Sequence, residues 1–129
     1  MSTNASVRVV AFAFTAYPVT DLARARAFYE GVLGLKPATT WESDGKGWYE
    51  YELGDSTLAI TNGAEKWKPS SSGPALALEV ADFPAAIAAL RAAGVTFAAE
   101  PTEFPPCHFA MVLDPDGNQL TIHHRKAVA

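Results

Sequence analysis

The chain has 129 residues, of which 49% are hydrophobic and 19% are charged, and its formal net charge at pH 7 is -4. This size and balance are typical of one folded domain and argue against a disordered chain. The excess of acidic residues, with Lys and Arg scattered along the sequence, argues against nucleic acid or an acidic membrane as a partner.

The cysteine content and the N-terminal residues indicate a compartment. The single cysteine, Cys107, cannot form an internal disulfide, which favours a reducing environment. The first six residues are polar and lack the charged and apolar regions of a signal peptide. The apolar run at residues 9–19 is too short to span a bilayer. We therefore expect a cytoplasmic protein with no membrane partner.

The first half of the chain predicts a strand, a helix and a hairpin. Residues 9–17 are rich in β-branched and aromatic side chains, which favours a strand buried on both faces. Asp21 is a good helix N-cap, apolar residues follow at helical spacing, and Gly34 supplies the stop. Residues 48–53 alternate as a strand does, and residues 56–61 form a second short strand.

The second half repeats this order. A strand is expected at residues 75–80, and a helix begins after Asp82 and ends near Gly94. Two further strands are expected at residues 107–113 and 119–124, separated by an Asp-Pro-Asp-Gly-Asn turn.

Two pairs of segments match between the halves. Residues 19–22 (VTDL) correspond to residues 80–83 (VADF), and residues 58–60 (LAI) correspond to residues 120–122 (LTI). Two copies of a unit that is too small to fold well alone predict a surface shared between the copies.

These elements predict an α+β protein of two units, residues 8–62 and residues 75–125. Residues 63–74, which are rich in Gly, Ser and Pro, form the expected linker. A further hairpin strand is expected near residues 36–41 and near residues 95–98. A ferredoxin-like split βαβ domain has the same element order and stays open as an alternative.

Two motifs carry a resemblance to a known family. The pattern VxDLxxAxxFYxxVLGL at residues 19–35, joined with DPDGNxL at residues 114–120, resembles the vicinal oxygen chelate superfamily. That superfamily includes glyoxalase I, bleomycin-resistance proteins, fosfomycin-resistance enzymes and extradiol dioxygenases. The resemblance covers residues 8–125 and implies two βαβββ modules whose sheets curl around a cleft, with the helices outside. In enzymes of the superfamily four side chains, usually His or Glu, hold a divalent metal in that cleft.

The resemblance places these four ligand positions on residues that cannot chelate. The first ligand of each module stands seven residues before the capping aspartate, which gives Phe14 and Ala75. The late-strand positions are Thr121 and, through the match between the two halves, Ala59. One Thr hydroxyl is the only oxygen in this set, so the usual metal site is expected to be absent.

Strand alternation from these positions predicts a largely apolar cleft. The predicted ligand-binding residues are Phe12, Phe14, Trp48, Glu50, Thr57, Ala59, Ala75, Cys107, Phe109, Met111, Thr121 and His123. Aromatic walls with a few polar groups are typical of a site for a flat or partly apolar small molecule. The same aromatic side chains could instead fill a closed cleft or a seam between subunits.

The polar members of this set are candidates for catalysis. Glu50 beside Trp48 could act as a base or bind a cation, or it could be a solvated carboxylate of an edge strand. His123 could bind a ligand or transfer protons, or it could lie at a solvent-facing strand end. Cys107 is expected to be a small filler rather than a nucleophile. A displaced site for Zn, Ni, Mn or Fe on Glu50, His123 and Cys107 is conceivable, but spacing alone does not support it.

Three hypotheses of function follow. The favoured one is a glyoxalase/bleomycin-resistance-like protein that binds a small organic molecule in the cleft with no metal or other cofactor. The second is a lyase, isomerase or dioxygenase-type enzyme that uses Glu50 and His123 or a displaced metal. The third is a non-catalytic structural or regulatory partner protein. The resemblance also implies a homodimer, with modules paired within one chain or swapped between two.

Overall fold

The computed structural model describes residues 8, 11–73 and 75–126, which form two four-stranded sheets. Sheet 1 has the order β1-β4-β3-β2, and sheet 2 has the order β5-β8-β7-β6. In chain order the first elements are β1 (Thr15–Pro18), α1 (Leu22–Arg26), a π-helix η1 (Ala27–Val32), β2 (Pro37–Ser43), β3 (Lys46–Leu53) and β4 (Ser56–Thr61). They are followed by β5 (Leu76–Glu79), α2 (Phe83–Ala92), β6 (Phe97–Phe104), β7 (Cys107–Leu113) and β8 (Gln119–Arg125).

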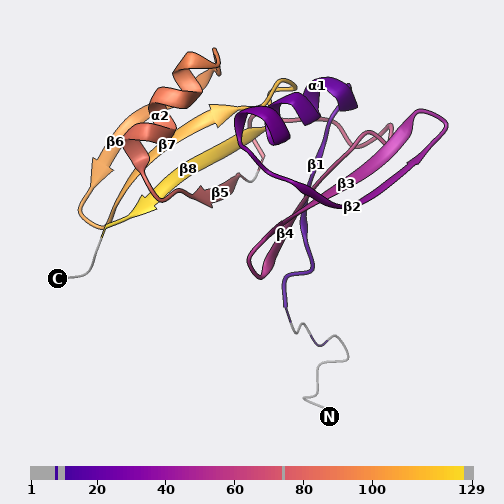
Figure 1. The fold of residues 1–129 in the computed structure, drawn as a ribbon, viewed down its shortest axis with the longest axis horizontal. Coiled ribbons are helices and arrows are strands. Elements are labelled where there is room, and N and C mark those ends of the chain that lie inside the picture. The colour runs from indigo at the N-terminus through magenta and orange to yellow at the C-terminus, as the bar shows by residue number, and fades with distance from the viewer. Residues whose placement is uncertain (1–7, 9–10, 74, 127–129) are drawn as a thin grey trace, which may run out of the picture.

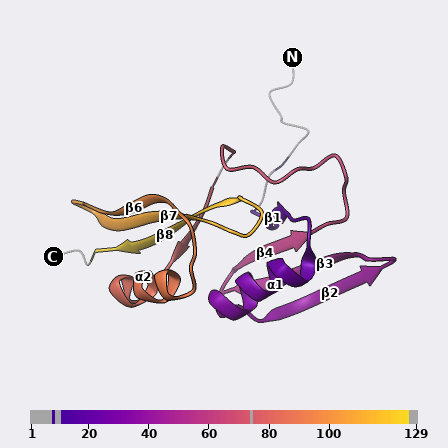
Figure 2. The same cartoon turned by 90° about the horizontal axis from the view of Figure 1, so that it is seen from above.

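The two sheets have the same topology, which confirms the α+β class. The first strand of each runs parallel to the last, and the remaining neighbours are antiparallel. Figures 1 and 2 show the sheets side by side, each with one helix against it. Because the strands form two separate sheets with the same strand order, the fold differs from a ferredoxin-like domain, which has a single sheet.

The helices begin and end where the capping residues predict. The Asp21 and Asp82 carboxylates accept hydrogen bonds of 3.0 Å from the backbone N–H groups of Arg24 and Ala85. Gly34 and Gly94, each at φ 74°, follow the helix ends. The first helix differs inside, since α1 passes into η1, whose i→i-5 bonding was not predicted. No helix of the described residues is long and apolar enough to cross a membrane.

The expectation of a fully buried first strand at residues 9–17 is wrong for the described part of it. β1 begins only at Thr15, Phe12 is fully exposed and Phe14 is 50% exposed, while residues 9 and 10 lie outside the described residues. The physical reason is that β1 is an edge strand, paired with β4 alone. Among the described residues, no second strand covers the segment before it.

The helix-covered faces of both sheets contribute to one hydrophobic core. On sheet 1 the Tyr51 ring of β3 stacks with the Tyr29 ring of η1 at 6.2 Å, and both are fully buried. Leu120 and Ile122 are their buried counterparts in sheet 2. Side chains alternate along a strand, so the strand residues next to Tyr51, Leu120 and Ile122 point to the opposite face of each sheet, which no helix covers.

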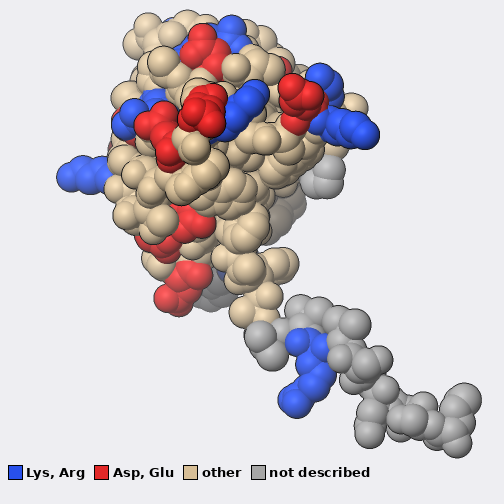
Figure 3. Space-filling view, turned by 90° about the vertical axis from the view of Figure 1, so that its right-hand side faces the viewer, with Lys and Arg blue, Asp and Glu red and all other residues tan. Residues whose placement is uncertain are grey.

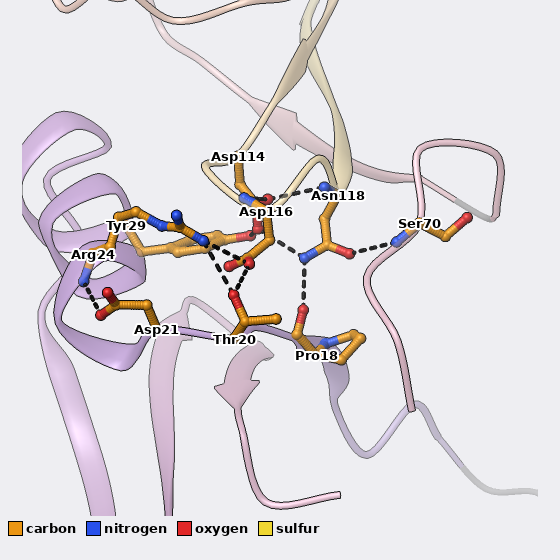
Figure 4. Close-up of polar contacts among 9 residues, drawn as sticks. All are labelled: Pro18, Thr20, Asp21, Arg24, Tyr29, Ser70, Asp114, Asp116 and Asn118. Carbon is orange, nitrogen blue, oxygen red and sulfur yellow. Dashed lines mark hydrogen bonds and ion pairs between the residues drawn. The ribbon is translucent and has the colours of Figure 1, made fainter. Parts of the chain in front are cut away.

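The Asp-Pro-Asp-Gly-Asn turn joins the two halves through a buried polar network (Figure 4). Tyr29 Oη donates to Asp114 Oδ2 at 2.9 Å. Asn118 Nδ2 donates to the Pro18 carbonyl at 2.8 Å and to Asp114 Oδ2 at 2.9 Å. The Ser70 N–H in turn donates to Asn118 Oδ1 at 3.1 Å. This motif therefore fixes the loop after β7 against the helix of sheet 1 and the connecting segment.

A second contact ties the two edge strands together. Tyr17 Oη donates to the Gln119 carbonyl at 2.7 Å and accepts from the Leu76 N–H at 2.8 Å. Burial raises the pKa of the Tyr17 hydroxyl, so it stays protonated as this geometry requires. The contact between β1 and β5 is thus held by hydrogen bonds of the Tyr17 hydroxyl as well as by apolar packing.

Candidate functional site

The uncovered face of sheet 1 carries the aromatic and acidic side chains that strand alternation predicts. Tyr49 and Tyr51 of β3 are buried beneath the helix, whereas Trp48 and Glu50, which alternate with them, are half-buried on the other face. Glu50 lies opposite Ala59 of β4 in the register. The alternation of side chains along β3 is therefore the expected one.

Direct contacts organise this face. The rings of Phe14 and Trp48 meet edge to face at 5.1 Å and 87°. Trp48 Nε1 donates to Glu50 Oε2 at 2.8 Å, and no hydrogen bond to Glu50 Oε1 is found among the described residues. The indole thus holds the carboxylate in place while one carboxylate oxygen stays available.

Trp41 belongs to this face although the sequence analysis did not include it. It is the register partner of Trp48 on β2 and is 58% exposed. The Asp44-Gly45 pair is the sequence signal that could have identified Trp41, because Asp-Gly is typical of a two-residue hairpin turn. Both residues have positive φ, 52° and 78°, as such a turn requires. Counting back from that turn on both strands places Trp41 directly across from Trp48.

The remaining predicted residues of this half differ in their surroundings. Phe12, Phe14 and Thr57 line a cavity of about 260 Å³ that Leu76 of β5 helps to close. The Thr57 hydroxyl is already engaged, since it lies 3.0 and 3.1 Å from the Glu52 carboxylate oxygens. The cavity therefore presents mainly aromatic and aliphatic surface.

The uncovered face of sheet 2 holds the other predicted residues. Register places Phe109 opposite His123, Met111 opposite Thr121, and Cys107 opposite Arg125. The Phe109 ring lies 5.6 Å from that of Phe104, which is exposed and was not among the predicted residues. Gln119 Nε2 lies 3.4 Å from Met111 Sδ. The predicted Ala75 is exposed just before β5.

His123 on this face is paired with a carboxylate. Its Nδ1 lies 2.5 Å from Glu79 Oε1, and Glu79 Oε2 accepts from the Arg125 N–H at 2.7 Å. These two contacts, the backbone N–H first and then the imidazole, hold the pKa of the Glu79 carboxyl below its usual value. The pair fixes the orientation of the His123 ring. Its partner Glu79 was not among the predicted site residues.

The two sets of predicted residues lie on separate sheets of one chain. The sheets are side by side, so their uncovered faces do not oppose each other (Figures 1 and 2). Among the described residues no hydrogen bond joins Glu50 and His123. Small residues of both strands do meet at the contact between β1 and β5, where Ala16 and Ala75 line a cavity of about 380 Å³ together with Trp67. One chain therefore presents the predicted residues on two separate faces with a narrow shared region.

The metal positions implied by the superfamily do not fit a divalent ion. Phe14, Ala59, Ala75 and Thr121 supply one hydroxyl between them. Within the described part of the chain, no group of three or more His, Cys, Asp and Glu side chains is arranged to hold a metal ion.

Comparison with known proteins agrees with this fold. The crystal structure of TnmS3, an antibiotic binding protein from Streptomyces sp. CB03234, has a TM-score of 0.77 and 24% identity, over 93% of this chain and 99% of that one. A glyoxalase/bleomycin resistance protein from the same organism has a TM-score of 0.69 and 26% identity, over 88% and 97%. The fosfomycin resistance protein FosX from Mesorhizobium loti has a TM-score of 0.68 and 19% identity, over 90% and 92%.

No curated protein matches the chain significantly in sequence. The family model of the glyoxalase/bleomycin resistance protein/dioxygenase superfamily matches residues 11–122, which is most of the chain. This match includes both sequence motifs. The chain therefore belongs to the glyoxalase/bleomycin resistance protein/dioxygenase superfamily.

Proposed function

We propose that this protein binds a flat, aromatic and positively charged small organic molecule on the uncovered face of sheet 1, without a resident metal. The observation that carries this proposal is the hydrogen bond from Trp48 Nε1 to Glu50 Oε2, which fixes a carboxylate at the edge of an aromatic surface. Phe14 and Trp41 extend that surface on either side.

The chemistry of this face selects such a ligand. Exposed indole and phenyl rings favour stacking with a flat ring system, and their negative faces also attract a cation. The free oxygen of the Glu50 carboxylate supplies a charge-assisted hydrogen-bond acceptor. On the side of the molecule shown in Figure 3, acidic and basic side chains are interspersed, so no extended field of one sign attracts ligands there. Discrimination by charge would then be local to Glu50.

A second copy of the chain completes the site in this proposal. The open faces of the two sheets do not oppose each other in one chain, and the apolar segment with Phe12 and Phe14 is uncovered. If sheet 2 of the second copy lies across this face, then Phe109 and Met111 supply the opposite wall. Each of the two equivalent sites of such a dimer would draw residues from both chains.

Binding rather than turnover is supported by the chemistry present on this face. The fold neighbour TnmS3 is described as an antibiotic binding protein, and this chain shares its fold. The proposed role is sequestration of a small molecule of that general kind. Among the described residues only Trp48 is hydrogen-bonded to Glu50, and an indole N–H does not act in proton transfer.

Quenching of tryptophan fluorescence tests the proposal. Proflavine serves as a flat aromatic cation and anthraquinone-2-sulfonate as a flat aromatic anion. We expect proflavine to bind with the lower Kd, and Glu50→Gln to raise that Kd about tenfold or more, since a charge-assisted hydrogen bond is lost. Glu65→Gln, on the exposed linker, is the control with the same charge change. Equal binding of the two dyes, or an unchanged Kd in Glu50→Gln, would refute the proposed site.

The Glu79–His123 pair favours a second candidate, an enzyme that uses His123 as an acid–base group. A carboxylate 2.5 Å from Nδ1 orients the imidazole, as the partner of a general base does. Mass spectrometry of ligand recovered after long incubation separates the two candidates. Recovery of unchanged ligand supports binding alone, whereas a product that disappears in His123→Ala supports catalysis.

A further inference from the structure

We propose that His108 and His124 form a binding site for a divalent transition-metal ion, of the Zn²⁺ or Ni²⁺ class, on the helix-covered side of sheet 2. This side is opposite to the face that carries His123, so the site is separate from both the proposed ligand site and the metal positions implied by the superfamily. It rests on the placement of the two imidazoles, on the tautomer of one ring and on the stacking of the other.

The fold places both histidines side by side. They are direct register partners on the antiparallel strands β7 and β8. Side chains at such positions have Cβ atoms about 5 Å apart and point to the same face. Together with Ala81, Asp82, Phe83 and Pro84 they line a cavity of about 270 Å³. Two imidazoles therefore border one open space at the start of α2.

The hydrogen bond made by His124 leaves its other nitrogen available to a metal. Nδ1 lies 2.7 Å from the Val80 carbonyl oxygen, which can only accept, so Nδ1 carries the proton. In the neutral ring Nε2 then holds a lone pair. An N–H donated to a backbone carbonyl is the usual outer contact of a metal-bound histidine, because it fixes the ring and raises the basicity of the ligating nitrogen.

His108 is held by packing. Its ring stacks on that of Phe83 at 5.4 Å and 29°, which fixes the ring plane. The carboxylates of Asp82, in the cavity wall, and of Glu103, opposite His108 on β6, supply negative charge near the two imidazoles. Glu79 Oε2 is a third acidic neighbour, 3.8 Å from His124 Nδ1, and Lys126 is ion-paired with Glu103. Three carboxylates thus lie in the surroundings of the pair.

The ligand chemistry defines the class of ion. Imidazole nitrogens suit Zn²⁺ and Ni²⁺, whereas Mg²⁺ and Ca²⁺ require a shell of oxygen atoms. Since no third side-chain ligand is placed around one point in the described residues, water fills the remaining positions. A site with open positions of this kind binds the ion reversibly.

Calorimetric titration of the untagged full chain with Zn²⁺ and with Ni²⁺ at pH 7.5 tests the site. One ion per chain is expected, and His108→Ala and His124→Ala should each raise Kd at least about tenfold. His123→Ala, one residue away on the opposite face of β8, is the matched control and should leave Kd unchanged. Binding should weaken as the pH is lowered, because protons compete with the metal ion for ligating nitrogens.

Histidine ring spectra of the wild-type protein make the test independent of how the variants fold. On addition of Zn²⁺ the signals of His108 and His124 should shift, while that of His123 stays in place. Absence of binding would overturn the proposal. Loss of binding in His123→Ala, with His108→Ala unaffected, would also overturn it, because the ion would then lie on the other face.

Discussion

Glu30 of the π-helix is held by an ion pair and by a hydrogen bond from sheet 1. Arg26 donates to its two oxygens at 2.7 and 3.1 Å, and Tyr51 Oη donates at 2.8 Å. The hydrogen bonds from Arg26 first, and then the one from Tyr51, hold the pKa of the Glu30 carboxyl below its usual value. The ionised carboxylate is therefore the form that the folded state prefers.

We expect Glu30→Gln to lower the free energy of unfolding by about 1 kcal/mol at pH 7, since the pair is partly exposed. A depressed folded-state pKa gives stability that is full above the unfolded value of about 4.3 and is lost as pH falls through the folded value. The difference between wild type and variant should thus shrink as the pH falls below the unfolded value. Urea unfolding across this range measures it. Glu100→Gln, in an exposed pair with Arg91, is the control and should change little. A difference that does not depend on pH would contradict this account.

Residue-level prediction from sequence succeeded where alternation alone decides the outcome. Trp48 and Glu50 lie on the open face because Tyr49 and Tyr51 are needed in the core. It missed Trp41, whose face depends on the register of a turn, and the partnership of His123 with Glu79. Strands far apart in the chain meet in that pair, and their register is set by tertiary packing.

At the scale of elements, the first helix contains a glycine that its backbone does not require. Gly31 lies in the exposed part of η1, has no positive φ, and a Cβ built there meets nothing within 4 Å. Gly34, three residues on, has φ 74°, a conformation that costs an L-residue about 1–2 kcal/mol. Of these two neighbouring glycines, only Gly34 is required by its backbone conformation.

We expect Gly31→Ala to raise the free energy of unfolding by about 0.5–1 kcal/mol, because the unfolded chain loses freedom while the folded chain gains no clash. Gly34→Ala should lower it by about 1 kcal/mol or more. Thermal unfolding of both variants beside the wild type measures the contrast. If Gly31→Ala is destabilising, the π-helical turn needs the glycine for a reason that its local geometry does not show.

Element prediction was accurate at helix ends and poor at the first strand. Caps depend on neighbours in sequence, so Asp21, Asp82, Gly34 and Gly94 could be identified directly. The composition of residues 9–17 predicts burial, but burial needs a covering surface. The described chain covers β1 on one edge only.

At the scale of the whole molecule, the apolar segment before β1 is the feature most at odds with an isolated chain. Phe12 is fully exposed, and the uncovered faces of both sheets are open. The sequence could predict two similar units with a shared surface. It could not predict whether that surface forms within one chain, because a linker of this length permits either pairing. A second copy would cover the segment and bring the two faces together.

Substitution of Phe12 tests whether a second copy of the chain binds here. This side chain is fully exposed in the single chain, so its loss should not affect the fold of one chain. Light scattering after size exclusion should give the wild type a mass twice that of the 13.7 kDa chain. Phe12→Asp should shift it toward the monomer, because a dimer would bury the new charge, and should remove the dependence of Tm on protein concentration. Ser71→Asp places the same charge on the exposed linker and should leave the dimer intact. A monomeric wild type, or a Phe12→Asp dimer of unchanged stability, would show that this segment does not meet a second copy. The site would then have to be completed within one chain.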